Sequence, residues 1–600
     1  MKTNHLIAVG CNYWASHAGI FMWQKWDAQI VEDDLKQLAA HGMKILRIFP
    51  LWSDFQPVVL QRRYHGIKAG IAFEHGSLPD TEWGRAGIDP VMMERFRILL
   101  DLAAKYDLKV IIGLITGWMS GRLFAPRAFE NLNLLTDPFA IHWEILFVRA
   151  IVRAFKDHPA IESWDLGNEC NCLSPADSEQ AWVWNYVIKS AIREEDPSRP
   201  VVSGMHNRNL DPANGWNIPQ IGENNDVLTT HPYPLFTEHV LHAPFYEFPA
   251  TLQATAETLY AGDLAGKPCF IEEAGSLGPM ITDNEHAAKN MRTALYSALV
   301  HGIDKYLWWC AFDQNCIEES APYEWTALER RLGLFSAQRV PAATALEMKQ
   351  FAEQELPFDE LPARKVHAVV LLSNNQEYWR AAYGAMITAK RAGYEVKFAR
   401  VNAPLPESDI YLLPCVSSPT AVHRRYWLAL LEKVKNGAKL LVTWNDAVLE
   451  PFESVFGCHV QERVLHASSP VIAGTPCPRG VTIRLKNDSA EVLESDNGFP
   501  VISRNIYGKG MIEIVNAPIE YAAVDPAFNY EKVYSEFFRA CGVEPVFEEK
   551  KSEIGVTEHI YPDGRTLVAM INYSSTSGRI RIRGKEYSVP GNEVCFTILS

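Results

Sequence analysis

The sequence lacks the features that mark several classes of protein. No apolar run is long enough to span a membrane, and the N-terminus lacks the apolar core of a signal peptide. No run of lysine and arginine occurs, and a net charge of −15 argues against a nucleic-acid surface. We therefore expect a cytoplasmic protein that has neither nucleic acid nor membrane as a partner.

Motifs for metal binding are also missing. The chain contains no His-x-His or His-Glu-x-x-His pattern, and Cys170 and Cys172 form a close pair that no second pair accompanies. The eleven cysteines are odd in number and scattered, which predicts reduced thiols and no disulfide framework. We expect no metal and no cofactor.

What the first part of the chain does contain is a regular alternation of short apolar runs and amphipathic segments. Such alternation is typical of βα units, and residues 1–350 are expected to form one domain of eight of them, a (β/α)8 TIM barrel of the α/β class. A doubly wound sheet is the alternative, but no strand leads into a phosphate-binding glycine fingerprint. The predicted strands cover 6–12, 43–50, 108–115, 161–167, 199–204, 226–232, 267–273 and 303–310.

The 600 residues of the chain exceed what one core usually holds, so further domains are expected after the barrel. Residues 360–545 are predicted to form a flavodoxin- or amidotransferase-like α/β domain with a β-rich insertion. Residues 546–600 alternate strands and turns and predict a small antiparallel β domain. Cys415 follows a strand without the glycine-rich surroundings of a nucleophile, so we interpret it as a buried strand cysteine.

Two carboxylate-bearing strand ends carry the chemistry. Glu169 ends the apolar run IESWDLGNE, and the pair Glu272-Glu273 ends KPCFIEE. Active sites of TIM barrels lie at the carboxyl ends of the strands, and two facing carboxylates there are the groups that hydrolyse glycosidic bonds. Because side chains alternate along a strand, only one of Glu272 and Glu273 is expected to face the lumen.

These motifs resemble clan A of the glycoside hydrolases, especially family 5. LGNE at 166–169 is similar to the strand-four motif, which implies that Glu169 is the acid/base and that Asn168 binds a sugar hydroxyl. KPCFIEEAG is similar to the strand-seven motif, and its register implies Glu273 as the nucleophile, with Glu272 a bystander.

The resemblance extends to other strands. Arg47 matches a strand-two arginine that bonds the nucleophile and keeps it ionised, and a nearby cation does depress a carboxylate pKa. His231 and Tyr233 are similar to a strand-six element whose histidine contacts substrate and whose tyrosine orients the nucleophile. Trp309 resembles the strand-eight tryptophan under the cleaved sugar, although Trp308 remains an alternative. Weaker candidates are Asn12, Trp14 and Trp118.

Two departures leave the sugar open. The chain has LITGWMSG where family 5 commonly carries a strand-three histidine, and Cys170 stands where a proline often follows the acid/base. The order of barrel, α/β domain and β domain resembles family 42 β-galactosidases and some β-mannosidases. In those enzymes the middle domain builds a trimer, so a homotrimer is implied.

We therefore expect a retaining, exo-acting β-glycosidase of oligosaccharides. β-Mannosidase is the first choice, with β-galactosidase and β-glucosidase as alternatives, and a catalytically inactive carbohydrate-binding or scaffold protein as an alternative of another class. Residues 52–84 are predicted to be a long loop that walls the site into a pocket. The two roles predict a raised pKa for Glu169 and a low one for Glu273.

Overall fold

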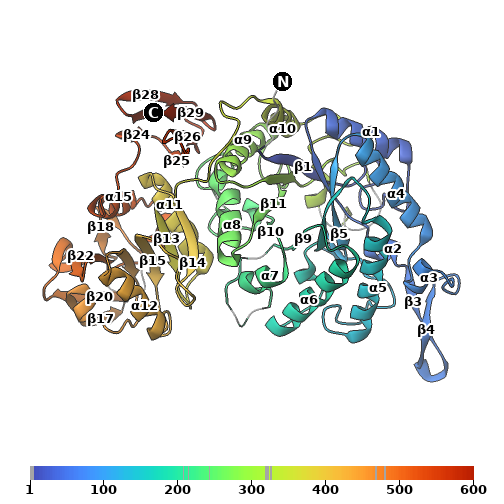
Figure 1. Cartoon of the computed structure of the whole chain (residues 1–600), viewed down its shortest axis with the longest axis horizontal. Helices are drawn as coiled ribbons and strands as arrows, with labels where there is room; N and C mark the ends of the chain where they lie inside the picture. Colours follow the sequence, from blue (N-terminus) through green and yellow to red (C-terminus); the bar gives the residue numbers. More distant parts are fainter. Residues whose placement is uncertain are drawn as a thin grey trace. The chain divides into compact units, whose positions relative to one another are not determined.

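The computed structural model of the chain describes residues 6–206, 208–211, 213, 215–241, 243–317, 323–324, 327–465, 469–478 and 481–600 (Figure 1). The chain divides into two compact units. The first comprises 1–236, 265–299 and 303–359, and the second comprises 237–264, 300–302 and 360–600. Among the described helices, none has both the length and the apolar character needed to cross a membrane.

Eight parallel strands form the barrel of the first unit, which confirms the predicted fold class. In sheet order they are β10 (Leu228–Thr230), β11 (Cys269–Ala274), β12 (Lys305–Trp308), β1 (Ala8–Tyr13), β2 (Ile45–Ile48), β5 (Lys109–Ile115), β8 (Ile161–Gly167) and β9 (Val201–Val202). A parallel bridge between Val202 and Val227 closes the ring. Every predicted strand overlaps one of these eight. The strands are rich in apolar residues, as expected where helices cover a parallel sheet, and the buried charged side chains among them belong to the site described below.

Helices alternate with the strands around the barrel (Figure 1). They are α1 (Ala28–Ala40), α4 (Pro90–Lys105), α5 (Pro138–Phe155), α6 (Ser178–Glu195), α7 (Ile218–Asn224), α9 (Asn284–Val300) and α10 (Ala343–Glu353). Side chains cap some of their N-termini: Asp27 accepts backbone hydrogen bonds at the start of α1, and Asp177 and Gln180 form a capping box on α6. Between β10 and β11 the chain passes through α8 (Ala250–Ala265), which falls almost entirely in the second unit.

The segment after β2 is not the irregular loop that the sequence predicted. It contains α2 (Trp52–Phe55), the hairpin of β3 (Val58–Arg62) and β4 (Lys68–Phe73), the turn η1 (Tyr64–Gly66) and α3 (Glu82–Arg85). Two short runs joined by a connection that contains a Tyr-His-Gly turn fit a hairpin with a glycine-bearing loop. At the tip, Tyr64 is almost fully exposed. A smaller hairpin, β6 (Trp118–Met119) and β7 (Arg122–Leu123), follows β5.

The second unit is built on a seven-stranded sheet. Its order is β14 (Val396–Arg400), β13 (Ala368–Leu372), β15 (Ile410–Val416), β16 (Lys439–Trp444), β23 (Gly510–Val515), β22 (Phe499–Tyr507) and β21 (Glu491–Asp496). The first five strands pair in parallel and the last two pair antiparallel. Its helices are α11 (Tyr378–Ala392), α12 (Arg424–Lys435), α13 (Glu453–Phe456), α14 (Ile519–Ala523) and α15 (Glu531–Ala540).

Short antiparallel strands complete this unit. One group is β17 (Cys458–Leu465), β18 (Val471–Ile472), β19 (Thr475–Pro476) and β20 (Val481–Asn487). The C-terminal group is β24 (Glu549–Lys551), β25 (Ile554–Ile560), β26 (Thr566–Asn572), β27 (Gly578–Ile582), β28 (Lys585–Val589) and β29 (Val594–Leu599), in two three-stranded sheets. Whether 360–545 and 546–600 are separate domains stays a prediction. Cys415 is fully buried, and burial raises the pKa of its thiol well above the ordinary value.

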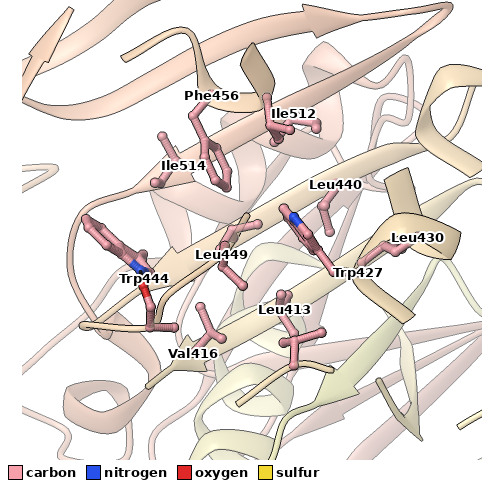
Figure 2. Packing of buried hydrophobic residues seen from close by; sticks show 14 of the residues in the cluster. Leu413, Val416, Trp427, Leu430, Leu440, Trp444, Leu449, Phe456, Ile512 and Ile514 are labelled. Atoms are coloured by element: carbon pink, nitrogen blue, oxygen red, sulfur yellow. Dashed lines mark hydrogen bonds between the residues drawn. The ribbon is translucent and has the colours of Figure 1, made fainter. Parts of the chain in front are cut away.

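The core of the α/β part lies between the sheet and α12. Trp427 of α12 packs among Leu413, Leu440 and Ile514 of the strands, with Phe456 stacked at a ring distance of 6.1 Å (Figure 2). Its side chain is 1% exposed. The Trp427 ring therefore packs α12 against the seven-stranded sheet.

Replacing Trp427 with alanine should destabilise the second unit. Removing a fully buried tryptophan costs about 3–5 kcal/mol, because transfer free energy is lost and a cavity remains. We expect calorimetry to show a lower melting temperature for Trp427→Ala and an unchanged one for Val448→Ala, whose side chain is mostly exposed. Equal melting temperatures for Trp427→Ala and the wild type would contradict this packing.

Candidate active site

Six of the seven predicted site residues line one cavity of about 430 Å³ at the carboxyl ends of the barrel strands. They are Asn168, Glu169, His231, Tyr233, Glu273 and Trp309. The volume is within the usual range for small-molecule sites. None of residues 52–84, all of which are described, lines this cavity, so the expected wall from that segment is wrong.

Glu169 follows the end of β8 in a left-handed conformation, with φ 44°. Its backbone N–H donates to the carbonyl of Gly204, at 2.9 Å, which ties the ends of β8 and β9 together. Gly204 has φ +60°, and a Cβ there would lie 1.9 Å from Asp165 Oδ1. Only glycine satisfies both constraints, because other side chains disfavour that φ and would collide with the carboxylate.

Arg47 lies fully buried beside the cavity and joins three strands. Its Nη1 donates to Glu273 Oε1 at 2.7 Å and to Asn168 Oδ1 at 3.0 Å, and its Nε donates to Asp165 Oδ2 at 2.8 Å. The planar guanidinium suits such divided bonding, since its N–H groups point in fixed directions. Arg47 of β2 thereby positions Asp165 of β8, Asn168 just after β8 and Glu273 of β11.

Glu272 also belongs to this cluster, contrary to the predicted bystander role. Its Oε1 lies 3.3 Å from Arg47 Nε and its Oε2 lies 3.2 Å from His231 Nε2. The reason is a bulge in β11. Ile271 pairs with Tyr306 but Ala274 pairs with Trp308, so β11 advances by three residues where β12 advances by two. A bulge breaks the alternation of side chains, and both neighbouring glutamates turn toward the same charges.

His231 connects the carboxylates. Its Nδ1 is 2.9 Å from Glu169 Oε1 and 3.5 Å from Glu273 Oε2, while Nε2 faces Glu272. Burial opposes the imidazolium, but the charge of Glu273 and the bonds to Glu169 and Glu272 outweigh it and raise the pKa of His231 to about 10. Tyr233 donates its hydroxyl to Glu273 Oε2 at 2.8 Å. Glu273 thus has a partner on each oxygen.

The predicted order of the two carboxyl pKa values is wrong. Burial would raise the pKa of Glu169, but the hydrogen bond and charge of His231 prevail and lower it. For Glu273, burial prevails over the charges of His231 and Arg47 and raises the pKa. Burial raises the pKa of both groups, and the difference lies in their partners: His231 hydrogen-bonds Glu169, whereas the charge of Glu169 adds to the rise for Glu273.

The remaining candidates either line the cavity or pack against the residues around it. Trp309 lines the cavity, whereas Trp308 is buried and donates its indole N–H to Leu332 O at 3.1 Å. Trp118 lines the cavity, and Asn168 Nδ2 donates to its carbonyl at 3.0 Å. Asn12 donates from Nδ2 to Glu272 O and Trp308 O, and Trp14 stacks on Phe49 at 5.2 Å.

Three further residues of the site were not predicted from the sequence. Asp165 is fully buried against Arg47, and burial raises its pKa to about 8 although Arg47 opposes the shift. An acid inside the apolar run IESWDLG was a usable signal, the same one that selected Arg47. His206 lines the cavity and its ring stacks on His231 at 6.1 Å. Glu329 also lines the cavity, and nothing in its local sequence marks it.

The arrangement provides two carboxylates at short range. An oxygen of Glu169 and one of Glu273 lie within 4.8 Å of each other. His231 Nδ1 lies 2.9 Å from Glu169 Oε1 and 3.5 Å from Glu273 Oε2. Carboxyl groups about 5 Å apart suit a double displacement, whereas about 6.5–9.5 Å is needed to admit a water between them. These three groups could also be considered as metal ligands. However, an imidazolium has no lone pair to offer, and both ring nitrogens of His231 face carboxylates.

A closed barrel with carboxylates converging at its strand ends is the architecture of the TIM-barrel glycoside hydrolases. Residues 11–315 match the family model described as Cellulase (glycosyl hydrolase family 5). The chain belongs to this family.

Curated relatives are similar over the barrel. A probable mannan endo-1,4-beta-mannosidase F of Aspergillus flavus is 25% identical over 273 residues, which are 44% of this chain and 56% of that protein. Mannan endo-1,4-beta-mannosidase A of Podospora anserina is 25% identical over 260 residues, 41% of this chain and 64% of that protein. The chain therefore spans little more than half the length of these relatives.

Solved structures are similar over nearly the whole chain. An exo-beta-1,4-mannosidase from Opitutaceae bacterium strain TAV5 covers 89% of this chain and 96% of its own, with TM-score 0.69 and 23% identity. A beta-galactosidase from Bacillus circulans sp. alkalophilus covers 99% of both chains, with TM-score 0.69 and 14% identity. At these identities the likeness concerns the fold, which is that of the family 5 barrel with the family 42 architecture.

The charge of His231 makes a prediction about stability and pH. The pKa of His231 in the folded chain, about 10, lies above the ordinary value of 6.5, so the stabilising effect of its charge is complete below pH 6.5 and is lost as pH rises through 10. At about 1.4 kcal/mol per pKa unit, the charge of His231 contributes a few kcal/mol to the free energy of unfolding. We expect the melting-temperature difference between wild type and His231→Asn to be large at pH 6 and to shrink by pH 10.

A difference that is constant over this range would contradict the ion pairing of His231. The substitution His158→Asn serves as control, because that histidine lies outside the cavity and contacts an exposed aspartate.

Proposed function

We propose that the protein is a retaining β-glycosidase that removes terminal β-linked mannose from oligosaccharides. The observation that carries the proposal is the separation of Glu169 and Glu273, whose nearest oxygens lie within 4.8 Å. This separation favours double displacement with retained configuration. Family membership supports the class of reaction.

In the proposed mechanism Glu273 attacks the anomeric carbon and forms a glycosyl ester as the bond to the leaving oxygen breaks. Glu169 gives its proton to that oxygen. It then takes a proton from water, the hydroxide attacks the anomeric carbon, and the ester breaks to restore the Glu273 carboxylate. Arg47 and Tyr233 each bond one oxygen of Glu273, so its attacking orientation is fixed before substrate arrives. Asn168, held by Arg47, binds a hydroxyl of the sugar.

Because the pKa of Glu169 is lowered, His231 supplies the proton that Glu169 gives to the leaving oxygen. His231 Nδ1, which carries this proton, lies 2.9 Å from Glu169 Oε1. The negative charge of Glu273 is what chiefly holds that proton on the imidazole. Formation of the ester removes this charge, so the pKa of His231 falls and its proton passes toward Glu169 as the leaving group needs it.

The names of relatives support mannose as the sugar. The curated relatives are named as mannan endo-mannosidases and one structural relative as an exo-mannosidase. A β-galactosidase is the second candidate, because the structure of that name covers 99% of this chain. β-Glucosidase and a catalytically inactive carbohydrate-binding or scaffold protein are the remaining alternatives, and the intact charge cluster argues against inactivity.

A cytoplasmic location and a homotrimer complete the proposal. All eleven cysteines are free thiols, which supports a reducing compartment. The trimer is supported by the full-length likeness in fold to a family 42 structure. Light scattering of the purified chain tests the assembly, since a single-chain mass would reject it.

The catalytic roles are tested with Glu169→Ala, Glu273→Ala and Glu272→Gln on a panel of nitrophenyl β-glycosides. We expect the β-mannoside to be hydrolysed best, and nuclear magnetic resonance to show β-mannose as the first product. Loss of the acid/base should lower kcat by about 10²–10⁴ for poor leaving groups. Azide should rescue the Glu169 variant as β-mannosyl azide and the Glu273 variant as α-mannosyl azide.

Glu272→Gln is the matched control, because it alters a neighbouring buried carboxylate that supports Arg47 and His231. It should reduce kcat yet give no azide adduct. Unchanged turnover in the Glu169 or Glu273 variant, or α-mannose as first product, would reject the mechanism. An azide adduct from the Glu272 variant instead of the Glu273 variant would exchange the roles of these neighbours.

A further inference from the structure

The residues that line the cavity differ in exposure. The side chain of Glu169 is 27% exposed and Phe236 is 56% exposed, whereas Trp309 and Glu329 are only 5% and 8% exposed. An acid that protonates the leaving oxygen must lie next to the leaving group. We therefore expect the leaving group beside the more exposed Glu169, and the terminal sugar toward the buried Trp309 and Glu329.

Glu329 is a third carboxyl group in this cavity, and the mechanism above does not use it. It belongs to the turn η4 (Ala327–Arg330), which follows β12 in the chain. Its Oε2 accepts the indole N–H of Trp309 at 3.3 Å, and the side chain of Ser120 in the β6–β7 hairpin also bonds to it. The carboxyl group thus joins the tryptophan floor to a second wall of the cavity.

The combination of an apolar ring and a buried carboxyl matches a pyranose. The C–H face of a sugar packs on an indole, and its hydroxyl groups need acceptors once they leave water. Burial raises the pKa of Glu329 to about 7, and the charges of Glu273 and Glu169 add to the rise. A carboxyl group poised in this way either accepts a hydroxyl bond or donates one.

The geometry points to Glu329 as a specificity-determining residue that binds a hydroxyl at the non-reducing end of the terminal sugar. With Trp309 it closes the cavity beyond that sugar, so a longer chain cannot continue there and only terminal residues are cleaved. This inference rests on the proposed function and adds the group that recognises the chain end.

The test compares substrates that lack single hydroxyls. Wild type, Glu329→Gln and Glu329→Ala are assayed with nitrophenyl β-mannoside and with its 3-deoxy, 4-deoxy and 6-deoxy analogues. A hydrogen bond to a carboxylate contributes about 1.5–3 kcal/mol, so its loss should lower kcat/KM by about 10–100-fold. Wild type should discriminate against one analogue by this factor, and Glu329→Ala should hydrolyse that analogue and the parent at similar rates.

The discrimination against the other analogues should be unchanged in the variant, which a merely structural role of Glu329 would not predict. Glu329→Gln retains an acceptor for Trp309 and the size of the side chain, so its discrimination among the analogues can be measured even if Glu329→Ala folds poorly. Glu324→Gln, an exposed carboxyl in the same segment, is the control.

Two failures can be told apart. If wild type hydrolyses none of the panel glycosides, the proposed function is wrong. If it hydrolyses them but Glu329→Ala keeps the wild-type ratio for every deoxy analogue, only the role of Glu329 is wrong. Cleavage of internal bonds of mannohexaose by wild type as fast as terminal bonds would likewise overturn the closed chain end.

Discussion

The site depends on one buried cation. Arg47 is wholly enclosed, yet Glu272, Asp165 and Glu273 raise its pKa above the ordinary value against the effect of burial, so it stays charged. Removing a partner from such a cluster is costly because an uncompensated charge remains. The positions of Asn168 and Glu273 follow from its fixed N–H directions, and the neighbouring Gly204 is glycine because Asp165 stands where a Cβ would lie.

His231 is the complementary centre, since it distributes positive charge among Glu169, Glu272 and Glu273. Arg47 holds its charge permanently, whereas His231 gives up its proton when its surroundings lose negative charge. In the proposed mechanism Arg47 fixes the orientation of Glu273, and His231 links the charge of Glu273 to the protonation of Glu169.

Much of this arrangement could be predicted from local sequence, because strand ends, acids and apolar runs are local patterns. Glu169 and the pair Glu272-Glu273 were selected in this way, and the family resemblance added Arg47 and the choice of Glu273. The structure brings Glu169, Glu273 and Arg47 together. Glu272 was misplaced because its direction depends on the register of β11 against β12, which alternation does not reveal. The order of the carboxyl pKa values depends on where His231 lies in space, and Glu329 reaches the cavity only through the fold of a turn after β12.

The bulge in β11 also bears on how the barrel folds. Its two glutamates meet Arg47 of β2 only when strands far apart in the sequence have come together, and Asp165 of β8 must join them. A half-closed barrel would hold these charges partly desolvated without their counterions, so intermediates of that kind are penalised. We therefore expect this charge cluster to make closure of the barrel more cooperative.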